Sequence, residues 1–286
     1  MATEIRELIE EGVARLARVA DNPRLDAEVL LAAALGVRRS HLAAFPERQV
    51  LDCEATDRYE AYVTRRALGE PVAYILGDKE FWSLSLRVEP AVLIPRPETE
   101  LVVERALAHL PLDADADVLD LATGSGAIAL AIANERPYCR VTGTDVSSGA
   151  IAVASRNARR LGLDRVGFLT GPWYEPVQGM NFDLIASNPP YVAEGDPRVE
   201  RSVRRFEPHA ALYTGPTGLE AIRAIVAGAV RHLKPGGWLV LEHGDTQGEP
   251  VRDLLSGAGF AAVNTHRDLA GLERCTEGVR NSGPAP

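Results

Sequence analysis

Short apolar runs alternate with helical stretches from residue 117 onward, and this alternation limits the possible fold more than any other feature of the chain. Strands are expected at 118–121, 141–145, 166–170, 182–187 and 238–242, and helices at 127–134, 149–161, 218–233 and 249–257. Two further strands, at 261–266 and near Cys275, would complete the sheet. Strands separated by helices form a mostly parallel sheet with helices on both faces. The sequence therefore predicts an α/β, Rossmann-like sheet.

The residues before this alternation have the pattern of a small helical bundle. From Ile5 to Val19, apolar residues recur at three- and four-residue steps, which indicates an amphipathic helix. Later, Trp82 to Val88 alternates as a strand, and Val72 to Leu76 is expected to pair with it in a hairpin. We therefore divide the chain into three predicted domains. They are an N-terminal helical domain (1–75), a β-hairpin linker (76–92) and an α/β domain (93–286).

The composition is that of a globular protein and argues against several classes of function. A net charge of −9 gives no reason to expect direct nucleic acid binding. The three cysteines form no C-x-x-C motif and the six histidines show no ligand spacing, so we expect a reducing compartment and no metal site. The N-terminus lacks the basic and apolar regions of a signal peptide, and no apolar run approaches the ~20 residues that span a bilayer. We expect a cytoplasmic monomer that does not bind membranes.

A glycine-containing loop follows the first strand of the alternation. The loop is Ala122-Thr123-Gly124-Ser125-Gly126, and its glycines let a ligand approach the backbone while the next helix presents free N–H groups. About 20 residues further on, Asp145 ends the second strand, where a carboxylate can accept hydrogen bonds from ribose hydroxyls. This pattern predicts a cofactor that contains adenosine. It leaves both NAD and S-adenosylmethionine open.

The motif Asn188-Pro189-Pro190-Tyr191 follows the fourth strand and decides between these cofactors. Two prolines stiffen the loop and leave its carbonyls free. The Asn188 side-chain oxygen and the Pro189 carbonyl can each accept one N–H of a planar NH₂ group, and Tyr191 can pack on the face of that group. An NAD enzyme has no evident use for this arrangement. We therefore predict methyl transfer from S-adenosylmethionine to such a nitrogen, with Asn188, Pro189 and Tyr191 as catalytic residues and S-adenosylhomocysteine as the product.

Several motifs together resemble the HemK/PrmC family, the peptide chain release factor glutamine N5-methyltransferases. They are D-L-A-T-G-S-G-A-I-A-L-A at 120–131, N-P-P-Y at 188–191, L-I-P-R-P-E-T-E at 93–100, E-F-W-S-L at 80–84, R-F-E-P at 205–208 and L-E-H-G at 241–244. The resemblance implies that the substrate is the glutamine of the Gly-Gly-Gln motif in class I release factors, with the helical domain used for docking. It implies a cofactor site of Ala122, Thr123, Gly124, Ser125, Gly126, Asp145, Trp173 and Asn188, and a substrate site of Asn188, Pro189, Pro190 and Tyr191.

Two positions depart from the family pattern, both on the cofactor side. Ala122 stands where the family usually has glycine, and we expect its methyl group to fit if φ is negative there. Pro172 precedes Trp173 where the family usually has an aspartate, which can bind the adenine amino group. Elsewhere, the sequence leaves Arg96 free to pair with either Glu98 or Glu207. It also leaves Glu242 free to bind the backbone or the neighbours of N-P-P-Y.

Other functions stay open at this point. An adenine-N6 nucleic-acid methyltransferase would use the same planar NH₂ chemistry, but it would need a basic groove or a target-recognition domain. A glutamine methyltransferase of a ribosomal protein would share the N-P-P-Y motif. An NAD-binding oxidoreductase leaves that motif unexplained. A non-catalytic adaptor with the same fold would tolerate Ala122 and Pro172.

Overall fold

The computed structural model describes residues 3–281. Residues 1–2 of the first predicted domain and residues 282–286 of the third lie outside this described range. Contacts within the chain divide it into two units. The first, called the helical unit here, contains the chain up to Asp78 together with Arg201–Phe206. The second, called the sheet unit, contains Lys79–Glu200 and the chain from Glu207 onward.

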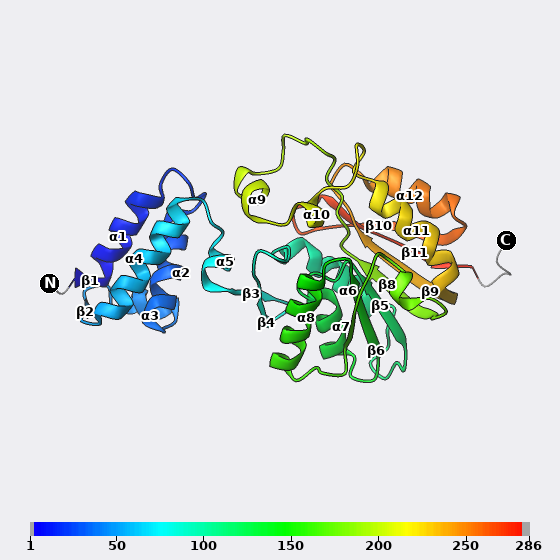
Figure 1. Ribbon diagram of the computed structural model, residues 1–286, viewed down its shortest axis with the longest axis horizontal. Coiled ribbons are helices and arrows are strands. Elements are labelled where there is room, and N and C mark those ends of the chain that lie inside the picture. The colour runs from blue at the N-terminus through cyan, green and yellow to red at the C-terminus, as the bar shows by residue number, and fades with distance from the viewer. Residues whose placement is uncertain (1–2, 282–286) are drawn as a thin grey trace. The chain divides into compact units, whose positions relative to one another are not determined.

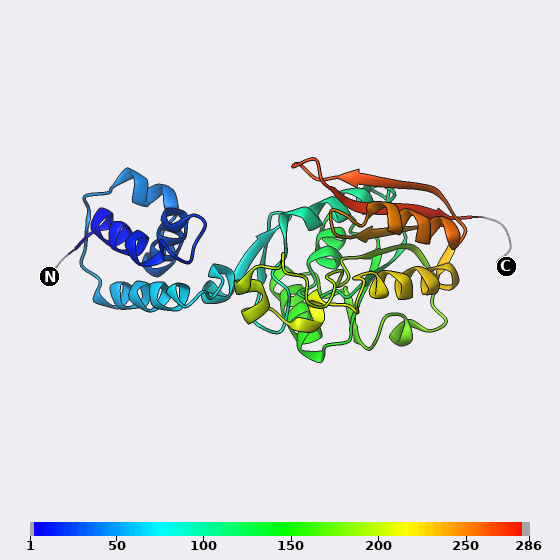
Figure 2. The same ribbon diagram turned by 90° about the horizontal axis from the view of Figure 1, so that it is seen from above.

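The part of the helical unit up to Asp78 is a bundle drawn in blue and cyan in Figures 1 and 2, and Arg201–Phe206 is drawn in yellow-green. The elements of the unit are α1 (Ile5–Leu16), α2 (Pro23–Leu35), α3 (Arg39–Ala44), α4 (Cys53–Ala67), α5 (Val72–Leu76) and α9 (Arg201–Phe206), with β1 (Thr3–Glu4) paired to β2 (Gln49–Val50). The Asn22 side chain caps α2 by accepting from Leu25 N, and Gly36, at φ +65°, ends it. Asp52 caps α4 in the same way. Asn22 and Asp52 thus mark where two helices begin and Gly36 marks where one ends, while apolar stripes such as Ile5, Leu8 and Leu16 form the core.

Two local expectations for the region between the domains were wrong. Val72–Leu76 is a short helix and not a strand, because Pro71 precedes it and Gly77, at φ +74°, ends it. The alternating run after it is broken into β3 (Asp78–Phe81) and β4 (Leu84–Arg87), which pair with each other. Trp82 and Ser83 join them with positive φ values of 50° and 58°, the backbone that a two-residue hairpin turn requires.

The sheet unit is built on a seven-stranded sheet in the order β10-β11-β9-β8-β5-β6-β7. The strands are β5 (Asp117–Leu121), β6 (Arg140–Asp145), β7 (Gly167–Thr170), β8 (Phe182–Ser187), β9 (Leu233–Glu242), β10 (Phe260–Arg267) and β11 (Glu273–Arg280). From β5 to β9 all neighbours are parallel, and β11 is antiparallel to both β9 and β10. The predicted Rossmann-like α/β sheet is confirmed.

Helices cover both faces of this sheet (Figure 1). The elements are η1 (Pro97–Thr99), α6 (Glu100–Ala108), α7 (Ala127–Glu135), α8 (Ser148–Leu161), η2 (Glu175–Val177), α10 (His209–Leu212), α11 (Glu220–His232) and α12 (Gly248–Gly257). Leu130 and Ile132 of α7 are buried in one apolar cluster, and Ile222 and Ile225 of α11 in another. Two separate cores therefore hold the sheet between helix layers, with β10 and β11 at one edge in orange and red (Figure 2).

The strand order places a crevice beside β5. From β5 the chain continues to β6 and β7 on one side, and it then returns to β8 on the other side. Loops that leave the carboxyl ends of β5 and β8 must therefore diverge. In open α/β sheets such a switch point is where ligands bind.

A buried ion cluster ties α6 to the outer strands of the sheet. Both oxygens of Glu277 on β11 accept from Arg105 at 3.1 Å, and His109 Nε2 lies 3.1 Å from Oε2. Burial alone would raise the pKa of Glu277, but the hydrogen bonds from His109, Arg105 and His266 lower it to about 2. The cluster therefore stabilises the fold in its ionised form.

We predict that Glu277→Gln lowers the unfolding free energy of the sheet unit by about 2 kcal/mol, because it leaves the partly buried Arg105 charge without its carboxylate. Denaturant unfolding followed by tryptophan fluorescence measures this. All three tryptophans, at 82, 173 and 238, lie in the sheet unit.

The half-exposed pair of Glu89 with Arg156 provides the matched control. Glu89→Gln should cost less than about 0.5 kcal/mol, the usual value of a surface pair. The folded-state pKa of Glu277 lies below that of an unfolded glutamate. Its contribution is therefore complete above the unfolded pKa and is lost as the pH falls toward about 2. Equal losses in the two variants at neutral pH would contradict the assignment.

Candidate active site

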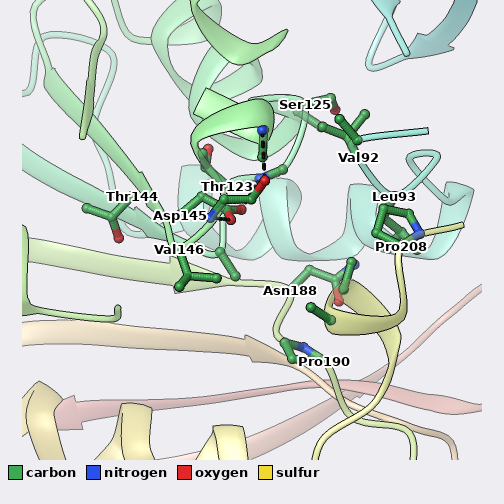
Figure 3. Close-up of a pocket in the computed structure, with 18 of the residues that line it drawn as sticks. Val92, Leu93, Thr123, Ser125, Thr144, Asp145, Val146, Asn188, Pro190 and Pro208 are labelled. Atoms are coloured by element: carbon green, nitrogen blue, oxygen red, sulfur yellow. Dashed lines mark hydrogen bonds between the residues drawn. The ribbon is translucent and has the colours of Figure 1, made fainter. Parts of the chain in front are cut away.

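A cavity of about 320 Å³ opens at the carboxyl ends of β5, β6 and β8. Its walls include the glycine loop after β5, Asp145 at the end of β6 and Asn188 after β8. Figure 3 shows these side chains around one space, with Leu93 and Pro208 near Asn188. Three segments that are far apart in the sequence thus meet at the switch point of the sheet.

Buried polar groups hold the glycine loop in place. Asp120 Oδ2 accepts from the Thr123 hydroxyl at 2.6 Å and from Ala129 N at 3.1 Å. Asn157 of α8 donates to the Ser125 carbonyl at 2.9 Å. Burial raises the pKa of Asp120 to about 7, against the opposing effect of those two hydrogen bonds. The loop is therefore fixed by side chains that lie behind it, not by the glycines alone.

Asp145 bridges the glycine loop to the start of α8. Its Oδ2 accepts from Gly124 N at 3.0 Å and its Oδ1 from Ser147 N at 2.9 Å. Burial raises the pKa of this carboxyl, while the two backbone hydrogen bonds act in the opposite direction. Each oxygen keeps a lone pair for a further donor, since a carboxylate has about four acceptor positions.

The predicted site residues divide into those that line the cavity and those behind its wall. The lining residues are Ala122, Thr123, Gly124, Ser125, Asp145, Trp173, Asn188 and Pro190. Gly126 instead precedes α7 at φ +83°, and its N–H donates to the Thr123 carbonyl. Pro189 is buried. Tyr191 is not among the lining residues, and its hydroxyl donates to Glu242 Oε1 at 3.1 Å.

Trp173 enters the cavity wall on a strained backbone. It has a φ of +44°, and its carbonyl accepts from the Thr144 hydroxyl at 3.1 Å. Pro172 beside it also lines the cavity. The position before the tryptophan thus faces the ligand space but carries no polar group.

Arg96 pairs with Glu207, which decides between its two predicted partners. The distance between Arg96 Nη2 and Glu207 Oε1 is 2.5 Å, and Glu207 Oε2 accepts from Ile94 N at 3.1 Å. Glu207 is almost fully buried. The pair fastens the segment before η1 to the segment that leads into Pro208, so two of the cavity walls support each other.

Cavity residues that the sequence did not indicate are mostly apolar. Val92, Leu93 and Val146 lie in the wall on loops, and Ala210 and Ala211 lie in it on α10. Nothing in their local pattern separates them from ordinary core residues. Asp120 was detectable, because it interrupts an otherwise apolar strand.

Comparison with known proteins identifies the family. The PrmC N-terminal domain model matches residues 7–77, and the methyltransferase small domain model matches residues 103–219. A release factor glutamine methyltransferase from Pseudomonas aeruginosa is 52% identical over 90% of this chain and 94% of its own length. One from Escherichia coli is 43% identical over 96% of this chain and 98% of its own length. The chain belongs to the release factor glutamine methyltransferase family.

Solved structures support the same fold. A methyltransferase from Pyrococcus furiosus aligns with a TM-score of 0.53 at 19% identity, over 78% of this chain and 98% of that chain. The 16S rRNA N2 G1207 methyltransferase of T. thermophilus, in complex with AdoMet and guanosine, gives 0.55 at 20% identity over 71% of this chain and 50% of that chain. At these identities the likeness shows the methyltransferase fold alone.

Within residues 3–281, no group of three or more histidine, cysteine, aspartate or glutamate side chains is placed to hold a metal ion. Over the same range, the helices are too short or too polar to traverse a lipid bilayer.

Ala122 departs from the family glycine at a position that favours glycine. Its φ is +55°, so the condition under which its methyl group was expected to fit, a negative φ, is not met. A left-handed backbone brings the Cβ of an L-residue too close to the following carbonyl oxygen, which costs about 1–2 kcal/mol. Ala122 also lines the cavity, so the strain lies at the ligand space itself.

We predict that Ala122→Gly stabilises the sheet unit by about 1 kcal/mol, because it relieves the left-handed strain that an alanine carries. Tryptophan-detected unfolding measures this. As a control, Ala262→Gly relieves a similar φ of +48° on β10, away from the cavity. It should stabilise the unit without changing ligand binding. If Ala122→Gly lowered the unfolding free energy, the claim that Ala122 strains the backbone would be wrong.

Proposed function

We propose that this chain transfers a methyl group from S-adenosylmethionine to N5, the side-chain amide nitrogen, of the glutamine in the Gly-Gly-Gln motif of class I release factors, and so tunes translation termination. The observation that carries the proposal is that Asn188 lines the same cavity as the glycine loop and Asp145. The names of the family members supply the substrate class.

The residues around the cavity fit S-adenosylmethionine. A Cβ added at Gly124 would meet no atom within 4 Å, so the backbone there is open to a ligand. Asp145 has lone pairs left for ribose hydroxyls, and Trp173 lies where a ring can face adenine. Pro172 supplies no bond to the adenine amino group. When bound, S-adenosylmethionine supplies an electrophilic methyl group and leaves as S-adenosylhomocysteine.

The chain's own part in the reaction is to orient a poor nucleophile. The lone pair of a glutamine amide nitrogen is delocalised into its carbonyl. Asn188 Oδ1 and the Pro189 carbonyl would accept its two N–H groups, which holds the nitrogen in place and localises its lone pair. No base is needed before the attack, because the nitrogen loses its proton after it becomes cationic. We assign Tyr191 to the support of this loop, since its hydroxyl is bound by Glu242.

The helical unit, which includes the match to the PrmC N-terminal domain, is our candidate for docking the release factor. We further infer a monomer that works in the cytoplasm without binding nucleic acid. The proposal of a reducing compartment rests on the cysteine pattern of the sequence, which has three cysteines and no C-x-x-C motif.

The function is tested by incubating the protein with labelled S-adenosylmethionine and one of three substrates. These are a purified class I release factor, the same factor with its Gly-Gly-Gln glutamine replaced, and DNA. We expect label on the unchanged factor only. Label on DNA would favour an adenine methyltransferase, and neither label nor cofactor binding would favour an adaptor.

Asn188→Ala should reduce kcat by about 10²–10³, the usual loss when one group of a preorganised site is removed. Cofactor affinity, measured by calorimetry, should stay within a few-fold. The matched control is Asn264→Ala on the exposed face of β10, which should change neither quantity. Equal losses of kcat and cofactor affinity in Asn188→Ala would mean that this side chain mainly binds the cofactor.

A further inference from the structure

Four side chains form a connected group at the cavity wall: Asn188 and Thr99, which line the cavity, and Glu242 and Tyr191, which do not. Asn188 Nδ2 donates to the Thr99 hydroxyl at 3.0 Å, and the Tyr191 hydroxyl donates to Glu242 Oε1 at 3.1 Å. The Thr99 hydroxyl also interacts with the Glu242 carboxyl and lowers the pKa of that acid. Thr99 is 3% exposed and Glu242 1% exposed, so water does not replace these contacts.

The direction of the hydrogen bonds in this group follows from the chemistry of its members. An ionised carboxylate only accepts, and a threonine hydroxyl has a single hydrogen to donate. If that hydrogen points at Glu242, the Thr99 oxygen can only accept from Asn188. The observed bond from Asn188 Nδ2 to Thr99 has this direction.

This direction determines which end of the Asn188 amide faces the ligand space. The two ends of an asparagine amide have nearly the same shape, so packing alone selects between them poorly. With Nδ2 held by Thr99, Oδ1 is left for a ligand. A substrate NH₂ group needs this acceptor, since the opposite orientation would bring two NH₂ groups together.

We propose that Thr99 and Glu242 are positioning residues that hold the Asn188 amide with its oxygen toward the substrate nitrogen. This inference rests on the proposed function for its catalytic consequence, whereas the amide orientation itself exists without turnover. Thr99 lies in η1, in the I-P-R-P-E-T-E stretch, and Glu242 ends β9 in L-E-H-G. The I-P-R-P-E-T-E and L-E-H-G motifs would thereby each supply a residue that orients Asn188 of the N-P-P-Y motif.

The setting of Glu242 argues against a purely stabilising role. Burial raises its pKa to about 7; hydrogen bonds from Thr99 and Tyr191 lower it, the charge of Glu98 raises it, and Arg274 lowers it. Its Oε2 is buried and has no partner with ordinary hydrogen-bond geometry among the described residues. A buried acceptor without a partner costs stability. We attribute the presence of an acid at this position to its effect on the Thr99 hydroxyl.

The test compares Thr99→Val with Thr99→Ser at a mildly alkaline pH, where Glu242 is ionised. Valine has the shape of threonine but cannot bind Asn188, so kcat on release factor should fall about tenfold to a hundredfold. KM and cofactor affinity should change less than threefold. Serine restores the hydroxyl and should recover most of kcat. Thr142→Val on β6, outside the cavity lining, is the matched control and should behave as wild type.

Glu242→Gln gives an independent arm. Its Oε1 can still accept from Tyr191, but its NH₂ group then donates to Thr99 and turns the threonine hydrogen toward Asn188. We expect a similar loss of kcat. The kcat of the double variant Thr99→Val/Glu242→Gln should be no lower than the kcat of the less active single variant, because both residues act through one amide. Multiplied losses, or a Thr99→Val enzyme with normal kcat, would overturn the proposal.

The amide orientation is also measured without turnover. In ¹⁵N-labelled protein with S-adenosylhomocysteine, the side-chain NH₂ signals of Asn188 are assigned by their loss in Asn188→Ala. A hydrogen bond to Thr99 should shift one proton downfield in wild type and Thr99→Ser, and this shift should vanish in Thr99→Val. An unchanged spectrum in Thr99→Val overturns the proposal. Normal shifts in a wild type that methylates no release factor would instead count against the proposed function alone.

Discussion

The parallel pairing of β5 with β8 is the constraint on which the site depends. Leu121 pairs with Ser187, and the Ser187 hydroxyl donates to the Leu121 carbonyl at 2.7 Å. The next residue of each strand, Ala122 and Asn188, leaves the sheet at the same level. Neighbouring strands lie about 4.8 Å apart, so this register places the loop for the cofactor beside the loop for the substrate. A slip of one residue would move the apolar side chains of the shifted strand to the opposite face of the sheet.

Buried polar side chains then make this edge of the sheet rigid. Asp120 binds the glycine loop from below, and Asn157 joins the Ser125 carbonyl to the backbone of Arg87 on β4. The pair of Arg96 and Glu207 joins two further walls. A reaction that relies on orienting an amide nitrogen needs such fixed surroundings, because the chain supplies geometry more than acid–base chemistry.

Part of the backbone strain in the sheet unit lies in the wall of the cavity. Ala122 and Trp173 both line the cavity, and both have positive φ without being glycine. Such conformations persist only where surrounding contacts hold them, at about 1–3 kcal/mol each. The hydrogen bond from Thr144 to the Trp173 carbonyl is one such contact. The backbone shape of the cavity wall therefore lowers the stability of the fold.

Local patterns in the sequence predict the α/β class, the positions of most strands and helices, the glycine loop, Asp145 and the N-P-P-Y loop. Periodicity and turn residues are local, and the carboxyl ends of parallel strands meet by topology. Three contacts depend instead on how the chain packs in space: Arg96 pairs with Glu207, Tyr191 binds Glu242 and Asn188 binds Thr99. Those partners lie 51 to 111 residues apart in the chain. Their contacts depend on strand register and on loop paths, which no local pattern of residues encodes.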